Sequence, residues 1–393
     1  MKDSKFDIGI IGGLGHVGLP LGIVFAEAGM DVCLFDIDKK KAEMVSAGKM
    51  PFIEYGADGI LKKTIQNGRL KVSDDIKKIS GAKFIIIAIG TPVDEYLNPK
   101  TRAFIEFFES IKQYLDPSQV IIIRSTVYPK TCQQVLNALP KKHNWNIAYC
   151  PERIVQGHAI KELKELPQIV AGLSDNAVKE ASYLFGKISP KIIVTSMGEA
   201  ELVKLFSNAW RYVQFAVANQ FYMISNRFGV DYDKVRFAMR EGYERAHSVP
   251  SAGFAAGPCL LKDTMQLAAF QGNNFFLGHA AMMINEGLPN FIAEDLAKRY
   301  DLSKTKVGIL GMAFKADIDD IRDSLSFKLR KILKFHAAEV YCSDEYAKAP
   351  DFISKEELLQ KSDVIIIGVP HSEYKNLKFP KGKEVFDLWG IKK

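Results

Sequence analysis

Residues 6–18 read FDIGIIGGLGHVG, and this stretch decides the fold of the first part of the chain. It opens with a short, apolar, β-branched run, which is typical of a buried strand in a parallel sheet. Gly13, Gly15 and Gly18 then form a G-x-G-x-x-G sequence, and a helical pattern follows over residues 19–28. A strand, a glycine-rich turn and a helix in this order predict the βα unit that binds a dinucleotide.

Each glycine of this turn has an expected role. Gly13 is expected to make the tight turn, Gly15 to let a pyrophosphate approach the backbone, and Gly18 to let the helix pack closely on the strand. His16 and Val17 complete the predicted cofactor loop, and the helix N-terminus beside them attracts phosphate groups.

Asp36 predicts which dinucleotide binds. It ends the second apolar stretch and lies 18 residues beyond Gly18 (36 − 18). A carboxylate at this place accepts hydrogen bonds from ribose hydroxyls and repels a 2′-phosphate, so the predicted cofactor is NAD. Residues 39–41 are three lysines that could tolerate NADP, although a solvated helix face is the preferred interpretation.

The rest of the chain predicts an α/β protein. Apolar strands alternating with helical stretches indicate a doubly wound parallel sheet, with further strands at residues 84–89, 120–124, 147–149 and 192–194. Helical periodicity then dominates at residues 199–228, 232–240, 262–270 and 276–299. Finally, residues 306–311 mirror residues 7–12, and residues 361–370 echo residues 82–89.

We therefore predict two Rossmann-like doubly wound domains joined by a central helical region. The expected boundaries are 1–198 for the NAD-binding domain, 199–300 for the helical domain, and 301–393 for the second Rossmann-like domain. Two interpretations stay open for the long helix at residues 199–228: a dimer interface, or a core helix spanning two domains.

Composition excludes several classes of protein. The 393 residues carry a net charge of +7 without a basic block, so no nucleic-acid partner is expected. No apolar run reaches the roughly 18 residues that span a bilayer, and no secretory signal is visible, so we expect a cytoplasmic protein without a membrane partner. The five cysteines are widely spaced with no C-x-x-C pair, which argues against disulfides and a zinc site.

Two segments that follow predicted strands are candidates for the nicotinamide side of the cofactor. Thr91 and Pro92 follow one strand, and Ser125 and Thr126 follow the next. In doubly wound folds ligands bind at these carboxyl ends, but each segment read alone is equally an ordinary strand-ending turn.

Cys259 is the candidate nucleophile. It ends a stretch of small residues at 250–258 and stands just before a helical pattern that includes Lys262. A thiol near a helix N-terminus and a lysine is expected to have a lowered pKa. Cys33 and Cys342 lie inside apolar strands and are interpreted as buried hydrophobic residues. From position alone, a reactive and an inert Cys259 are equally supported.

These residues resemble the nucleotide-sugar 6-dehydrogenase family, which comprises UDP-glucose, UDP-N-acetylhexosamine and GDP-mannose dehydrogenases. The resemblance covers nearly the whole chain and rests on ordered motifs at residues 13–21, 51–54, 90–94, 124–127, 150–153, 201–208, 257–263, 311–315 and 320–324. It implies the fold predicted above, with NAD on the first domain, a UDP-sugar on the last, and a homodimer formed through the long helix.

The resemblance also implies a mechanism with a covalent intermediate. Cys259 would attack the aldehyde left by a first oxidation, and the thiohemiacetal would be oxidised to a thioester that water hydrolyses. Lys204 and Asn208 would stabilise the oxyanion, while Asp263 would handle the water. Without the resemblance, Lys204 and Asn208 are interpreted as part of a solvated helix face.

Further roles are carried over in the same way. Thr126 and Glu152 would be additional polar partners in catalysis. The substrate would be held by Glu152, Arg153, Gly257 and the nucleotide-binding residues Phe314, Lys315 and Arg322, with Lys315 also reaching the cofactor. Arg245, 14 residues before Cys259 (259 − 245), would reach across the dimer to the sugar.

Departures from the family pattern leave the sugar open. Residues 255–258 read AAGP where the family is richer in glycine, so the added methyl groups and Pro258 are expected to stiffen and narrow one wall of the sugar pocket. Residues 262–263 look like the UDP-glucose branch, whereas residues 150–153 and the Arg245 spacing look like the UDP-N-acetylhexosamine branch. The preferred substrate is UDP-ManNAc or UDP-GlcNAc, followed by UDP-glucose and then GDP-mannose.

Two other functions remain as alternatives. A two-electron hydroxyacid-type dehydrogenase also joins a Rossmann domain to helices, but it needs no α/β domain after them. A non-catalytic binder of nucleotide sugars would keep the fold and lose the chemistry.

Overall fold

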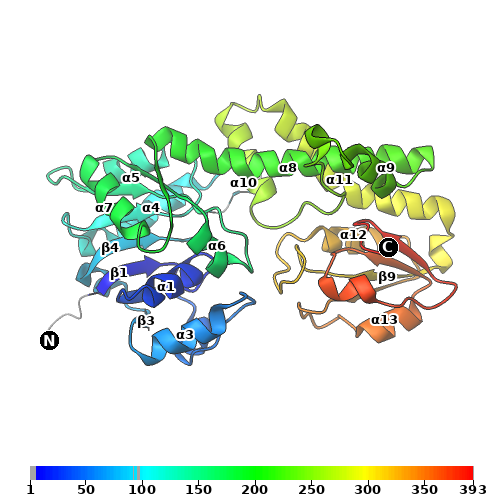
Figure 1. The fold of residues 1–393 in the computed structure, drawn as a ribbon, viewed down its shortest axis with the longest axis horizontal. Helices are drawn as coiled ribbons and strands as arrows, with labels where there is room; N and C mark the ends of the chain where they lie inside the picture. The colour runs from blue at the N-terminus through cyan, green and yellow to red at the C-terminus, as the bar shows by residue number, and fades with distance from the viewer. Residues whose placement is uncertain (1–5, 92, 95–97, 393) are drawn as a thin grey trace. The chain divides into compact units, whose positions relative to one another are not determined.

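The computed structural model describes residues 6–91, 93–94 and 98–392 (Figure 1). The chain divides into two compact units, one ending at Phe206 and the other beginning at Ser207. The boundary lies within helix α8 (Met197–Phe228), so the three-part division at residues 198 and 300 stays a prediction. Among the described residues, no helix combines the length and apolarity needed to cross a lipid bilayer.

The first unit contains an eight-stranded sheet in the order β3-β2-β1-β4-β5-β6-β7-β8. Its strands are β1 (Phe6–Ile11), β2 (Val32–Phe35), β3 (Leu70–Ser73), β4 (Ala82–Ile87), β5 (Val120–Ile123), β6 (Asn146–Tyr149), β7 (Gln168–Gly172) and β8 (Ile192–Val194). Neighbouring strands are parallel except β6 with β7. The predicted doubly wound sheet is confirmed.

Helices cover both faces of this sheet. They are α1 (Gly18–Glu27), α2 (Lys39–Ser46), α3 (Ala57–Gln66), α4 (Thr101–Ile111), α5 (Thr131–Ala138), α6 (Ala159–Glu165) and α7 (Asp175–Phe185), with 3-10 turns at Ile76–Gly81 and Lys112–Tyr114. Alternate residues of β4 enter two separate apolar clusters: Phe84 and Ile86 face α1, α3, α6 and α7, whereas Ile85 and Ile87 face α4 and α5. This alternation is what a strand buried on both faces requires.

The second unit begins with most of α8 and continues through three further helices, α9 (Tyr232–Arg240), α10 (Leu260–Phe270) and α11 (Phe276–Arg299). It ends in a parallel sheet of order β10-β9-β11-β12. The elements of this last part are β9 (Lys306–Leu310), α12 (Leu325–Leu333), β10 (Glu339–Ser343), α13 (Lys355–Lys361), β11 (Val364–Ile367) and β12 (Glu384–Asp387), with 3-10 turns at Leu302–Lys304 and Ser372–Asn376. A further 3-10 turn, Glu244–Ala246, lies between α9 and α10. One apolar cluster joins α11, α12 and β9.

The internal repeat predicted from sequence is present at the level of backbone geometry. The N–H of Gly12, after β1, donates to Phe35 O at 3.0 Å, and the N–H of Gly311, after β9, donates to Ser343 O at 2.9 Å. Both glycines have positive φ, +76° and +91°. The two sheets therefore open their first βα turn in the same way.

Candidate active site

The glycine turn of the first unit matches a pyrophosphate site. Gly18 cannot carry a side chain, because a Cβ there would lie 2.3 Å from Gly12 O. At Gly13 a Cβ would lie 2.7 Å from Leu34 Cβ, so this glycine is needed for packing, while the positive φ falls on Gly12. Gly13 itself lies within the turn, directly after Gly12. Gly15 is different, since a Cβ there would meet the protein no closer than 3.4 Å.

The start of α1 is suited to an anion. Val17 is its N-cap residue, no side chain caps the helix, and its first turn holds no acidic residue. Beside it, the ring of His16 lies 4.0 Å from the ring of Phe52 and 2.9 Å, at Nδ1, from Gln156 Nε2. The loop is thus held by neighbours, and the first turn of the helix has no acidic residue of its own to oppose the positive end of the dipole.

Asp36 directly follows β2 and has accepting capacity for a ligand. Its Oδ2 accepts from Leu14 N at 3.0 Å, and its Oδ1 accepts from Asp38 N at 3.1 Å. A carboxylate can accept about four hydrogen bonds, and Asp36 is only partly buried. The glycine turn and Asp36 together fit the adenosine and pyrophosphate parts of NAD.

The ends of β4 and β5 are linked to each other. Thr91 Oγ1 donates to Thr126 O at 2.6 Å, and Ser125 Oγ donates to Ile89 O at 2.7 Å. The structure therefore brings together the segments around Thr91 and Thr126, which the sequence analysis predicts to lie on the nicotinamide side of the cofactor. Pro92, predicted with them, lies outside the described residues.

Glu152 belongs to a buried polar network within the first unit. Its Oε2 contacts the guanidinium of Arg124, and its Oε1 accepts from the backbone N–H groups of Arg153 and Ile154 at 2.7 and 3.0 Å. Arg124 also donates to Gln168 Oε1 at 2.8 Å. Because both carboxylate oxygens are engaged inside the fold, these contacts suit a residue that shapes the loop. Arg153 donates in turn to Pro167 O at 2.5 Å.

Cys259 is exposed and is the N-cap residue of α10. Its carbonyl accepts from Asp263 N at 2.8 Å, which closes the first turn of that helix. The side chain therefore stands at the positive end of an eleven-residue helix. By contrast, burial raises the pKa of the Cys33 thiol to about 12 and that of Cys342 to about 11, in agreement with their interpretation as buried hydrophobic residues.

Asp263 and Asn208 form a buried pair behind the cysteine. Asn208 Nδ2 donates to Asp263 Oδ2 at 2.5 Å, and Lys262 Nζ lies 3.2 Å from Asp263 Oδ1. Asp263 is fully buried and Asn208 nearly so. The solvated-face interpretation is therefore wrong for Asn208. Lys204, one helical turn earlier on α8, is half-buried.

A second buried network fixes the segment before Cys259. Asn219 of α8 accepts from Gly253 N at 2.8 Å and donates to Gly253 O at 3.0 Å and to Asn285 Oδ1 at 2.9 Å. The methyl group of Ala255 packs in an apolar cluster with Tyr212 of α8. The narrowing of a sugar pocket expected from this methyl group is therefore wrong, because the side chain faces the core.

Gly257 connects this segment to the loop of residues 312–323 that follows β9. Its φ is +99°, and a Cβ there would lie 2.6 Å from the ring of Phe314. Its N–H donates to Asp323 O at 3.2 Å. The ring of Phe314 thus rests on the backbone two residues before Cys259.

Arg322, a predicted phosphate ligand, interacts electrostatically with Cys259. Its hydrogen bonds to the Asp320 carboxylate are the largest cause that raises the pKa of Arg322, and the charge of Cys259 adds to the same effect. Its Nε lies 3.0 Å from both oxygens of Asp320. Within the second unit, Gly257, Cys259, Phe314 and Arg322 therefore lie together. Arg245 is exposed in a 3-10 turn and stacks over Tyr243, with 5.9 Å from Cζ to the ring centre.

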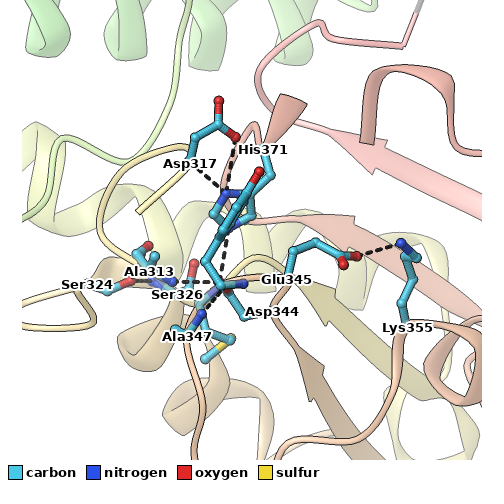
Figure 2. Close-up of polar contacts among 12 residues, drawn as sticks. Ala313, Asp317, Ser324, Ser326, Asp344, Glu345, Ala347, Lys355 and His371 are labelled. Carbon is cyan, nitrogen blue, oxygen red and sulfur yellow. Dashed lines mark hydrogen bonds and ion pairs between the residues drawn. The ribbon is translucent and has the colours of Figure 1, made fainter. Parts of the chain in front are cut away.

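In the last sheet, the residue at the position equivalent to Asp36 is Asp344, and both oxygens of its carboxylate already accept hydrogen bonds from the protein. Asp344 follows β10 as Asp36 follows β2, but its Oδ2 accepts from the N–H groups of Met312 and Ala313, at 2.6 and 2.9 Å (Figure 2). Its Oδ1 accepts from Tyr346 and Ala347 N–H, both at 2.8 Å. Burial favours a higher pKa for Asp344, but hydrogen bonds from His371 and backbone amides together outweigh it, so its pKa is lowered. This position has no capacity left for a ribose.

Two parts of the site escape sequence reasoning. Arg124 follows an apolar run, and a charged residue at such a place indicates that it has a buried partner. Its partners, Glu152 and Gln168, lie 28 and 44 residues later in the chain, so the local sequence does not identify them. Asn219 and Gln220 stand where the family commonly has Asn-Glu, but nothing local indicates that the partners of Asn219 are Gly253 and Asn285. Among the described residues, no group of three or more His, Cys, Asp or Glu side chains has the arrangement to hold a metal ion.

Comparison with known proteins assigns each part of the chain. Residues 6–188 match the NAD binding domain of the UDP-glucose/GDP-mannose dehydrogenase family, residues 198–286 its central domain, and residues 308–392 its UDP binding domain.

Two curated relatives span nearly the whole chain. The UDP-N-acetyl-D-mannosamine dehydrogenase of Pyrococcus horikoshii is 30% identical over 383 residues, covering 93% of this chain and 90% of its own. The enzyme of the same name from Methanocaldococcus jannaschii is 31% identical over 380 residues, covering 93% and 86%. A solved structure of the UDP-D-ManNAc dehydrogenase from Pyrococcus horikoshii has a TM-score of 0.90 at 29% identity, covering 98% of this chain and 96% of that one.

Proposed function

The chain belongs to the UDP-glucose/GDP-mannose dehydrogenase family, and from this premise we propose that it oxidises the C6 hydroxyl of a UDP-N-acetylhexosamine to the uronic acid. Its class of activity is NAD-dependent oxidation of a nucleotide sugar. One observation carries the finer proposal: Cys259 is exposed at the N-terminus of α10, with the Asn208–Asp263 pair behind it and the Phe314 loop beside it.

The proposed reaction removes four electrons in two steps. NAD, when bound, accepts the hydride of each oxidation. Between the steps, Cys259 Sγ attacks the C6 aldehyde and forms a thiohemiacetal, whose oxidation gives a thioester. Water then adds to the thioester, the C–S bond breaks, and the thiolate is regenerated. In total, one alcohol, two NAD and one water give one carboxylate, two NADH and three protons.

The residues around Cys259 have complementary tasks in this scheme. The helix N-terminus favours the thiolate. Asn208 Nδ2 has two hydrogens, of which one bonds Asp263, and we assign the other to the oxygen of the thiohemiacetal. We assign the ammonium of Lys204, one turn earlier on α8, to the same developing charge, and the Asp263 carboxylate to the attacking water.

The sugar is proposed to be N-acetylmannosamine. The two whole-length relatives above carry that sugar in their names, and residues 150–153 and Arg245 resemble the N-acetylhexosamine branch. UDP-GlcNAc is the next candidate within that class, and UDP-glucose is the alternative, favoured by the Lys262–Asp263 sequence.

The test is a panel of sugars with purified protein and NAD. UDP-ManNAc, UDP-GlcNAc, UDP-GalNAc, UDP-glucose and GDP-mannose are each supplied, and NADH absorbance is followed. UDP-ManNAc is expected to react fastest and to give two NADH per sugar consumed. One NADH per sugar, or full acid production by Cys259→Ala, contradicts the mechanism. Faster oxidation of UDP-glucose contradicts the choice of sugar alone.

We also propose a homodimer formed through α8. Trp210, Val217, Phe221, Ile224 and Phe228 are exposed and lie at intervals of seven, four, three and four residues. Such spacing places them on one helix face, and an apolar face of this kind pairs with the same face of a second copy. Light scattering is expected to give twice the chain mass, and Trp210→Glu with Ile224→Glu to give monomer. Phe335→Glu, at another exposed aromatic residue, is the matched control.

Two remaining assignments follow from the proposed reaction. We propose that residues 1–198, 199–300 and 301–393 serve as the cofactor, helical and nucleotide-sugar domains, with Lys315 placed to serve substrate and cofactor. Because NAD and UDP-sugars are cytoplasmic metabolites, we propose that the reaction takes place in the cytoplasm.

A further inference from the structure

His371 occupies a special place in the repeat that relates the two sheets. The N–H of Gly368 donates to Leu310 O, as the N–H of Ala88 donates to Ile11 O, both at 2.8 Å. Counting three residues on from each, His371 is the counterpart of Thr91 in the first unit. Thr91 lies on the side proposed for the nicotinamide, where it is partly exposed, whereas the side chain of His371 is fully buried.

The imidazole of His371 joins two other segments (Figure 2). Its Nε2 lies 3.0 Å from Asp344 Oδ2, and its Nδ1 accepts from the backbone N–H of Asp317 at 2.9 Å. The rings of Tyr346 and Tyr374 flank it, with centroids at 4.9 and 5.3 Å. One side chain therefore connects the loop after β9 to the ends of β10 and β11.

These contacts determine the form of the imidazole. A ring nitrogen that accepts from a backbone N–H carries no proton, so Nδ1 is unprotonated. The proton is then on Nε2, from which it is donated to the Asp344 carboxylate. Each ring nitrogen of His371 is therefore bonded to a different segment.

The segment that receives the Nδ1 contact is the nucleotide-binding loop. Asp317 lies two residues after Lys315 and has a left-handed backbone, with φ +59°. Its carboxylate accepts from Ser372 N at 2.8 Å and Ser372 Oγ at 3.1 Å, so the contact between the loop and residues 371–372 runs in both directions. Further along the same loop, the N–H of Phe314 donates to Asp320 O at 2.9 Å.

We propose that His371 is a positioning residue for the nucleotide end of the substrate. By fixing Asp317 it sets the conformation of residues 312–323, and with it the places of Phe314, Lys315 and Arg322. The residue acts through this loop and touches neither the reacting carbon nor Cys259. The proposal rests on the proposed function only in taking a uridine nucleotide as the ligand of this domain.

Two substitutions separate the two hydrogen bonds. Asn at position 371 places its Oδ1 near the position of Nδ1, so His371→Asn keeps an acceptor for Asp317 and loses the donor to Asp344. Gln is longer, so His371→Gln keeps a donor for Asp344 and loses the acceptor for Asp317. The two variants are similar in polarity and differ in which segment they release.

The measurements are calorimetric binding of UDP, calorimetric binding of NAD, melting temperature, and steady-state kinetics of the full chain. His371→Gln is expected to weaken UDP binding and raise KM for the nucleotide sugar about tenfold, because the partly buried N–H of Asp317 loses its partner. Its kcat at saturation and its NAD affinity are expected to stay within about twofold of wild type. His371→Asn is expected to melt lower yet bind UDP within about threefold of wild type.

Equal loss of UDP affinity in both variants, or unchanged affinity in His371→Gln, overturns the proposal. Should His371→Gln fail to fold, Asp317→Ala removes the second link at the same junction and must raise the Kd for UDP as well; an unchanged Kd again overturns it. Because UDP binding needs no turnover, a wild-type chain that binds UDP but oxidises no sugar contradicts the proposed function and leaves this proposal to be judged by the binding data.

Discussion

Gly257→Ala is expected to damage nucleotide-sugar binding more than its size suggests. The new Cβ would lie 2.6, 2.8 and 3.0 Å from three ring carbons of Phe314. An ordinary contact begins near 3.4 Å, so the ring must move by 0.8 Å (3.4 − 2.6) or the segment before Cys259 must move instead. Either movement displaces a residue assigned to the substrate.

The magnitude has two parts. A non-glycine residue at φ +99° costs about 1–2 kcal/mol. Overpacking against a ring held in place costs about 1–3 kcal/mol more. The second unit should therefore lose about 2–5 kcal/mol of stability. For catalysis, a displacement approaching 1 Å costs on the order of 10²-fold in rate, so kcat/KM is expected to fall about ten- to a hundred-fold.

Gly382→Ala is the matched control. Its φ is +82°, and nothing lies within 4 Å of a Cβ built there, so it adds the backbone strain without the overlap. Chemical denaturation and kinetics with the UDP-sugar are measured on both variants. The reasoning is refuted if both lose the same stability and Gly257→Ala keeps the wild-type kcat/KM, because Phe314 would then not rest on Gly257.

Three further outcomes are expected. Asn208→Ala removes a hydrogen bond to the buried carboxylate of Asp263, so kcat should fall about ten- to a hundred-fold with UDP and NAD binding unchanged by calorimetry; an unaltered kcat contradicts the assigned role. Arg124→Met leaves Glu152 buried without its cation and should lower the free energy of unfolding by about 3–5 kcal/mol, with partial recovery on adding Glu152→Gln; no recovery in the double variant argues against this pair as the cause. The pKa of Asp344 is lowered in the fold, so its contribution to stability is present above pH ~4 and is lost as pH falls through the folded-state pKa. The difference in melting temperature between wild type and Asp344→Asn should therefore be constant above pH ~5 and shrink below pH ~4, and a constant difference down to pH ~3 contradicts the assignment.

The fold is predictable from sequence where local patterns match a single environment. Residues 8–11 are apolar because this part of the strand is buried on both faces, and the same pattern at residues 307–310 predicts the second sheet. The helix at residues 276–299 is confirmed although Pro289 lies inside it, since the periodicity on both sides outweighs one lost backbone donor. The direction of β7 is not predictable, because an apolar run looks alike in parallel and antiparallel neighbours.

The candidate site is less predictable because its contacts are distant in sequence. Asn208 is one polar residue on an amphipathic helix, and only the packing of α10, 55 residues later, shows that it is buried against Asp263. Ala255 illustrates the reverse error, since the sequence predicts that its methyl group narrows the sugar pocket, whereas the methyl group packs in the core. Local pattern predicts which residues are unusual, whereas tertiary contacts determine which way they face.

The saturated carboxylate of Asp344 has a consequence for how the last domain opens. It collects N–H groups from residues 312–313 and 346–347 and the imidazole of His371, which are contributed by three stretches of chain. If any one stretch detaches, the buried carboxylate of Asp344 loses hydrogen bonds that water does not fully replace. Small local opening motions at this edge of the sheet are therefore disfavoured. Met312 and Ala313 lie outside any helix or strand. Their amide hydrogens should nevertheless exchange with deuterium as slowly as those of β9, because exchange requires one cooperative opening of the whole domain.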